Sequence, residues 1–192
     1  SCQSKQKTIE LMSTIDSTLQ VKATSILENK LSELNALSGQ AIVMEVQTGH
    51  IKAMVGLERK DSADYQSCEN FSQAYESALM QPISILAALE TGKVKLADTV
   101  ASSSNIAVYK TMEKAFGDDA QAYFSLLNNM SYGKPDSIAG IANLKPAYFV
   151  TPKNSGWSDT AFAWFCIGYN QTITPIQMLT FYNAIANSGK MV

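Results

Sequence analysis

The chain has 192 residues, of which 46% are hydrophobic and 17% are charged, and its formal net charge is −2. A chain of this size buries roughly 70% of its unfolded surface, so we expect one substantial core. It contains no basic block or Arg-rich stripe, which argues against nucleic acid as a partner. Its longest apolar run is too short to span a bilayer.

The three cysteines, Cys2, Cys68 and Cys166, lack the spacing of metal ligands, and we expect neither a metal nor another cofactor. Cys68 and Cys166 either pair in an oxidising compartment or remain two partly buried thiols, because sequence alone fixes no disulfide geometry. Cys2 heads a polar tail that runs to Thr8, as in a bacterial lipoprotein after its signal peptide is removed. Cys2 is therefore either a lipidation candidate or a chance cysteine.

A helix is predicted from Asp16 to Leu37. Residues 17–20 have the spacing of a capping box, and Gly39 is expected to stop the helix. Apolar residues recur at three- and four-residue steps, which places them on one helical face. They are Leu19, Ala23, Ile26, Leu27, Leu31 and Leu34.

A β-hairpin is predicted over residues 40–56, because two β-prone runs flank a turn at 47–50. Gly49 can supply the positive φ that a tight turn requires. Both faces of each strand are largely apolar, so we expect helices to cover the sheet on both sides. The only histidine, His50, has no partner cluster nearby and is interpreted as a solvated turn residue.

The rest of the chain is predicted to be mostly helical. After a polar, turn-like stretch at 57–70, helices are expected at about 77–90 and at 104–129, interrupted by Gly117. Residues 131–159 are rich in Gly, Pro, Ser and Asn and predict a loop. A last helix opens at Thr174-Pro175 and ends by 187–189. Its buried stripe is predicted to consist of Ile176, Leu179, Tyr182 and Ile185.

Several collinear stretches resemble the transpeptidase domain of monofunctional penicillin-binding proteins. They are residues 14–20, 39–56, 85–93, the triplet Ser103-Ser-Asn105, Tyr132-Gly-Lys-Pro135 and residues 167–178. The resemblance implies an α+β fold of the β-lactamase/transpeptidase-like type. In that fold an antiparallel sheet, of which only the early hairpin is present here, accompanies a mostly helical subdomain. The resemblance divides the chain into a tail, residues 1–13, and a partial transpeptidase-like domain, residues 14–192.

The chemistry that the resemblance implies is acylation of a serine by a peptidoglycan stem peptide, followed by transfer to an acceptor amine. β-Lactams acylate the same serine. The reaction needs three motifs, S-x-x-K, S-x-N and K-T-G. The implied location is the periplasmic side of a bacterial cell envelope, with lipid anchoring if Cys2 is modified.

The first motif is degenerate. In the family a proline follows the lysine directly, so counting back from Pro82 places Gln81 at the lysine position and Ala78 at the serine position. Ser77 is the only nearby hydroxyl, and three residues later stands Met80. Ser77 is thus either a surviving nucleophile or a serine that caps the helix. A glutamine amide cannot replace a general base, which contributes on the order of 10²–10⁴-fold to the rate.

The second motif, Ser103-x-Asn105, is intact. In the family this serine relays protons and the asparagine amide holds the substrate backbone, whereas helix capping is the alternative role. The third motif does not occur in residues 1–192, and the family places it on a strand after the segment that ends here at 189–192. The chain is either a natural short protein or a portion of a longer one.

The leading hypothesis is a catalytically inactive cell-envelope protein that binds peptidoglycan, and with it β-lactams, or a cell-wall synthesis protein. One alternative is an active D,D-transpeptidase whose remaining motifs lie beyond the chain. Another is a purely structural or regulatory interaction protein. A two-stranded hairpin alone is marginally stable. If the chain is a natural short protein, we therefore also expect its exposed edge to be covered, by a homodimer or a rearranged sheet.

Overall fold

The computed structural model describes residues 12–61, 63–99, 104–117, 119–158 and 160–192. The lipidation candidate Cys2 and the second-motif residue Ser103 lie outside the described residues. The elements are α1 (Ser17–Glu33), β1 (Ser38–Met44), β2 (Ile51–Glu58), β3 (Gln66–Ser67), a 3-10 turn (Asn70–Ser72), α2 (Met80–Glu90), α3 (Leu96–Thr99), α4 (Asn105–Phe116), α5 (Ala120–Asn129), β4 (Tyr148–Phe149), α6 (Ala161–Cys166), β5 (Gln171–Thr172) and α7 (Pro175–Ala186).

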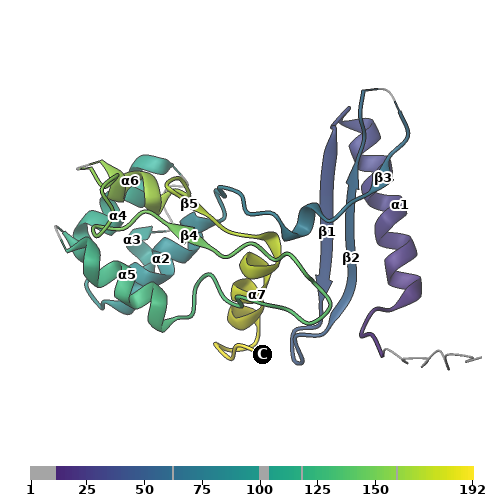
Figure 1. The fold of residues 1–192 in the computed structure, drawn as a ribbon. Coiled ribbons are helices and arrows are strands. Elements are labelled where there is room, and N and C mark those ends of the chain that lie inside the picture. Colours follow the sequence, from purple (N-terminus) through teal and green to yellow (C-terminus); the bar gives the residue numbers. More distant parts are fainter. Residues whose placement is uncertain (1–11, 62, 100–103, 118, 159) are drawn as a thin grey trace, which may run out of the picture.

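These elements form two lobes. Figure 1 shows the β1–β2 hairpin with α1 on one side of the molecule and α2 to α6 gathered on the other. Helix α7 lies between the two lobes, beside β1. The α+β, transpeptidase-like fold class expected from the sequence is confirmed by this architecture and by the structural neighbours described below.

The hairpin is antiparallel, and its register runs from the Ser38–Glu58 pair to the Val43–Ala53 pair, with an irregularity next to Met44. Gly49 adopts the expected positive φ, 70°, in the turn. A two-residue strand that the sequence did not predict, β3, extends the sheet in the order β1-β2-β3. A separate small sheet pairs β4 with β5.

Helices lie on both faces of the hairpin, as predicted. Val55 and Leu57 point to α1 and form a small core with Leu31. Gln40, which alternates with the β1 residues on that face, lies beside Pro175 and Leu179 of α7. Apolar side chains on both faces of the hairpin therefore reflect packing on both sides.

The larger core fills the helical lobe and centres on Tyr123, whose side chain is wholly buried among the rings of Phe116, Phe124, Phe162 and Phe165. Its hydroxyl lies 2.9 Å from Ser84 Oγ, which donates to the carbonyl of Cys166 at 2.8 Å. Burial raises the pKa of Tyr123 well above its ordinary value. The hydroxyl that this aromatic cluster buries is thus satisfied by hydrogen bonding, as buried polar groups must be.

The predicted ends of the first helix are wrong. Asp16 caps α1, and its Oδ1 accepts the backbone N–H groups of Thr18 and Leu19 at 2.9 and 3.0 Å. Gln20, the expected capping-box partner, instead bonds to the backbone of β2. The helix ends before Asn35, which has a φ of 50°, rather than at Gly39. The first N–H groups of a helix have no partner within the helix, and the carboxylate of Asp16 is a stronger acceptor for them than the hydroxyl of Ser17, the expected cap.

The predicted buried stripe of the last helix is also wrong in phase. Thr174 and Gln177 form a capping box at the start of α7, and the helix ends at Asn187 as expected. Of the predicted stripe, Ile176 is buried, but Ile185 is 46% exposed. The face that packs into the helical lobe contains Met178 and Phe181. Because the polar residues Gln177, Thr180 and Asn183 are buried as well, the spacing of apolar residues alone could not single out the packed face.

The remaining helices differ from expectation mainly at their starts. The helix expected from Ser77 begins at Met80, whereas α4 and α5 end where the sequence indicates. The one-turn α3 and the short α6 were missed, because such elements carry little periodic signal. Cys68 and Cys166 are both free thiols, in separate lobes. None of the described helices is long and apolar enough to cross a membrane.

Candidate functional site

A small polar pocket of about 190 Å³ lies where the start of α2, the first residue of α4 and the segment after α6 meet. It brings together Ala78 and Gln81 of the first motif and Asn105 of the second motif. Its lining consists of Glu76, Ser77, Ala78, Gln81, Asn105, Ile167, Gly168 and Tyr169.

A tight turn before α2 sets the spacing of the first motif. The Oγ of Ser77 accepts the N–H of Leu79 at 3.3 Å, and its carbonyl accepts the N–H of Met80 at 3.1 Å. The N–H of Gln81 donates to the carbonyl of Ala78 at 3.2 Å. Ala78 and Gln81 are therefore one turn apart on the same side of the helix start, with both facing the pocket.

An amide pair joins the two motifs. Gln81 Nε2 donates to Asn105 Oδ1 at 2.8 Å, although the residues are 24 positions apart in sequence. Asn105 is fixed because it opens α4, where Ser104 caps the helix by accepting the N–H of Ala107. The positions that the family uses for its lysine and its asparagine are thus in contact, and both side chains are uncharged.

Gly168 closes the pocket from the α6 side, a role that the sequence analysis did not assign. Its carbonyl accepts the N–H of Ser77 at 3.3 Å. Its φ is +107°, and a Cβ at this position would lie 2.0 Å from the carbonyl oxygen of Ser77. Only glycine permits so close an approach. The signal was present in the sequence, because Gly168 belongs to the stretch 167–178 that carries the family resemblance.

The described lining of the pocket holds one carboxylate, that of Glu76, and no cation. A methyl group, Ala78, stands where the family places its nucleophile, and its neighbour Ser77 uses its Oγ as an acceptor within the turn. Within the part of the chain that the structure describes, no cluster of three His, Cys, Asp or Glu residues could hold a metal ion. The described lining can therefore accept and donate hydrogen bonds.

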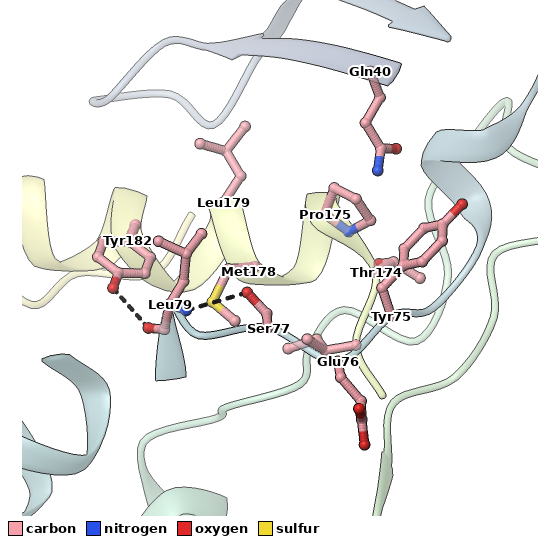
Figure 2. Close-up of a pocket in the computed structure, with 11 residues that line it drawn as sticks. Gln40, Tyr75, Glu76, Ser77, Leu79, Thr174, Pro175, Met178, Leu179 and Tyr182 are labelled. Atoms are coloured by element: carbon pink, nitrogen blue, oxygen red, sulfur yellow. Dashed lines mark hydrogen bonds between the residues drawn. The ribbon is translucent and has the colours of Figure 1, made fainter. Parts of the chain in front are cut away.

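A second, larger cavity of about 440 Å³ adjoins the polar pocket and shares Glu76 and Ser77 with it. Figure 2 shows this cavity between β1 above and α7 below, with Leu179 pointing toward β1. Tyr182 donates its hydroxyl hydrogen to the carbonyl of Leu79 at 2.8 Å and so fastens α7 to the turn before α2. Burial raises the pKa of Tyr182.

The family model of the penicillin binding protein transpeptidase domain matches residues 90–192, more than half of the chain. The chain belongs to this family. Similar curated proteins include the probable peptidoglycan D,D-transpeptidase PbpC of Pseudomonas aeruginosa, 23% identical over 93% of this chain. Another is the peptidoglycan D,D-transpeptidase FtsI of Escherichia coli, 23% identical over 91% of this chain.

Solved structures show the same fold. A peptidoglycan glycosyltransferase from Burkholderia ambifaria superposes with a TM-score of 0.76 at 19% identity, covering 94% of this chain and 63% of that one. The transpeptidase domain of penicillin-binding protein 3 from Burkholderia pseudomallei gives a TM-score of 0.68 at 18% identity, covering 93% and 59%. The chain spans 37% and 35% of the length of the two curated relatives.

Proposed function

We propose that this chain is a transpeptidase-like domain of the bacterial cell envelope that binds the peptidoglycan stem peptide without being acylated by it. The observation that carries the proposal is the hydrogen bond between Gln81 and Asn105 beside the methyl group of Ala78. Ser103, which lies outside the described residues, would complete the second motif.

The case against acylation rests on the residues at the nucleophile and base positions. Formation of an acyl-enzyme needs a hydroxyl and a group that takes its proton within hydrogen-bond reach. Ala78 has no hydroxyl, and the amide of Gln81 is neutral and already donates to Asn105. Ser77 as an alternative nucleophile would have Met80 in place of the lysine.

The case for binding rests on what the same groups retain. Asn105 accepts from Gln81 through Oδ1, and none of the hydrogen bonds found among the described residues uses its Nδ2 group. That donor can hold a backbone carbonyl of a peptide, which is the role the asparagine has in the family. A volume of about 190 Å³ suits a small terminal residue of a peptide rather than a large ligand.

The names of the relatives support the choice of ligand and location. The curated relatives are peptidoglycan D,D-transpeptidases, so peptidoglycan is the ligand class that the family likeness supports. We place the domain on the periplasmic side of the envelope, where this substrate lies. Lipid anchoring through Cys2 is part of the same proposal.

The binding is tested by titrating ¹⁵N-labelled protein with a disaccharide pentapeptide and following amide resonances by NMR. We expect shifts at the side-chain amides of Gln81 and Asn105 and at the backbone of Gly168. Asn105→Ala should weaken binding about tenfold, the equivalent of one lost hydrogen bond of ~1.4 kcal/mol. Asn128→Ala on the exposed side of α5 is the matched control and should change nothing.

Pocket resonances that stay unmoved at millimolar pentapeptide would contradict the proposal and favour a purely structural or regulatory role. The active-enzyme alternative, in which further motifs lie in polypeptide outside residues 1–192, predicts instead a covalent adduct with a β-lactam. A domain that binds a cell-wall synthesis protein is the second candidate function.

A further inference from the structure

The carboxamide of Asn105 could be turned in two ways within the polar pocket. Half a turn about its last side-chain torsion exchanges Oδ1 and Nδ2 with almost no change in shape, so packing does not decide between the two orientations. The choice matters for a ligand, because Oδ1 only accepts hydrogen bonds and Nδ2 only donates them. A hydrogen bond from a neighbouring residue must therefore fix which of the two atoms the ligand meets.

One hydrogen bond holds this carboxamide among the described residues. Gln81 Nε2 donates to Asn105 Oδ1 at 2.8 Å, and the described residues place no other hydrogen bond on either carboxamide. The backbone of Asn105 is fixed separately, because it is the first residue of α4 and Ser104 caps that helix. Within the described part of the chain, Gln81 alone thus determines how the side-chain amide of Asn105 is turned.

Gln81 is the better anchored member of the pair. It is the second residue of α2, and its backbone N–H donates to the carbonyl of Ala78 at 3.2 Å. The turn that precedes it is held by Gly168, whose carbonyl accepts the N–H of Ser77. The side chain of Gln81 is half-buried, whereas Asn105 is exposed. Asn105 is therefore expected to adopt the orientation that Gln81 allows.

We propose that Gln81 is a positioning residue, which turns the Asn105 carboxamide so that Nδ2 meets the ligand. Asn105 then acts only as a donor, and the ligand group that it contacts is an acceptor, a carbonyl oxygen. A lysine at position 81 would also donate, so glutamine supplies this hydrogen bond without the charge. The inference rests on the proposed peptide-binding function and deepens it, because it assigns the residue that sets the polarity of the contact.

A glutamate in place of Gln81 would reverse the contact. Its carboxylate only accepts, so Asn105 must turn and donate from Nδ2, which withdraws that donor from the ligand. When protonated, the same carboxyl group has an O–H that can donate to Oδ1, as glutamine does. The side chain barely changes in size, so Gln81→Glu changes the direction of one hydrogen bond and leaves the packing alone.

The test is the affinity of the protein for the disaccharide pentapeptide, measured by NMR titration at pH 7 and at pH 3. At pH 7 we expect Gln81→Glu to weaken binding about tenfold or more, because the ligand must break a hydrogen bond to a charged group. At pH 3, below the ordinary glutamate pKa of about 4.3, the affinity should return to within about threefold of the wild type. Each affinity is compared with the wild type at the same pH, so titration of the ligand and of Glu76 cancels.

Two control variants separate hydrogen-bond direction from charge and from folding. Gln81→Met leaves Asn105 unheld and should weaken binding about threefold at both pH values, the cost of ordering one side chain. Gln121→Glu adds the same charge at an exposed position on α5 and should match the wild type throughout. Circular dichroism checks that each variant is folded at both pH values. Wild-type affinity in Gln81→Met, or a loss in Gln81→Glu that persists at pH 3, would overturn the proposal.

A measurement on the free protein decides the positioning role without any ligand. In Gln81→Glu the Nδ2 protons of Asn105 should move downfield as the pH rises from 3 to 7, because they come to donate to the new carboxylate. In the wild type and in Gln121→Glu they should not. An Asn105 signal that behaves alike in all three proteins would overturn the proposal. If the shift occurs but the wild type does not bind the pentapeptide, the positioning role is supported and the peptide-binding function alone is contradicted.

Discussion

At the residue scale, the site depends on a few close backbone approaches as much as on its side chains. Gly168 lies against the turn that presents Ala78 and Gln81, and its positive φ and the carbonyl of Ser77 leave no room for a side chain. The position of the degenerate first motif is therefore held from outside α2. The hydrogen bond between Gln81 and Asn105 then joins that motif to α4.

Gly168→Ala should destabilise the protein strongly. A Cβ would meet the carbonyl of Ser77 and would also strain the backbone at φ +107°. We expect the free energy of unfolding to fall by about 2 kcal/mol more than in Gly140→Ala, where φ is +87° but no atom lies within 4 Å. Chemical denaturation of both variants measures the difference. Equal losses would mean that the close approach at Ser77 does not constrain the site.

At the element scale, α1 holds the hairpin in two ways, by apolar packing and by side-chain hydrogen bonds to the backbone of β2. Leu31 fills the small core under Val55 and Leu57, while Gln20 caps the far edge of β2. The hairpin is thus attached to α1 along the outer edge of β2 as well as across its face.

Gln20→Ala should reveal how much the capped edge contributes. The change removes two hydrogen bonds to Met54, each worth about 1 kcal/mol, so we expect a loss of about 2 kcal/mol in thermal or chemical unfolding. Gln121→Ala at an exposed position on α5 is the control and should cost less than ~0.5 kcal/mol. If the two variants were equally stable, water would satisfy the backbone groups of Met54 as well as Gln20 does.

Features that depend on neighbouring residues could be predicted from the sequence, whereas features that depend on distant contacts could not. The hairpin with Gly49 and the helix start at Thr174-Pro175 were predictable, because turn and cap chemistry is local. The role of Gln20 was not, because its partner lies 34 residues away. The site was partly predictable: motif spacing located Ala78, Gln81 and Asn105, but the contact across the two helices required the fold.

At the scale of the whole molecule, α7 connects the two lobes. Phe181 packs in the helical core, Asn183 donates to the carbonyl of Val46 at 3.0 Å, and Tyr182 donates to Leu79. Leu179 and Tyr182, on another side of α7, line the cavity of about 440 Å³. The protein thus has the fold of a transpeptidase domain around a polar pocket lined by Ala78, Gln81 and Asn105.

The tyrosines of this frame predict alkaline destabilisation. Burial raises the pKa values of Tyr123, Tyr132 and Tyr182 above the ordinary value of 10.0. The unfolded chain therefore loses phenolic protons at a lower pH than the folded chain does. The contribution of these tyrosines to the free energy of unfolding is therefore fully present below pH 10 and declines as the pH rises above it.

Denaturant midpoints between pH 8 and pH 11.5 check this expectation. Lysines also titrate in this range, so Tyr182→Phe serves as the internal comparison. It removes one of the three groups, and its stability should decline less steeply than that of the wild type even though it starts lower. A midpoint that stays constant to pH 11.5 would show that these phenols are not protected by folding.

The central claim, a transpeptidase-like site that cannot be acylated, is tested most directly by intact mass spectrometry after incubation with penicillin. An active penicillin-binding protein serves as the positive control. We predict that the protein keeps its unmodified mass while the control gains one acyl group. A stable adduct on the chain, mapped by peptide digestion to Ser77, would contradict the account and make Ser77 a nucleophile.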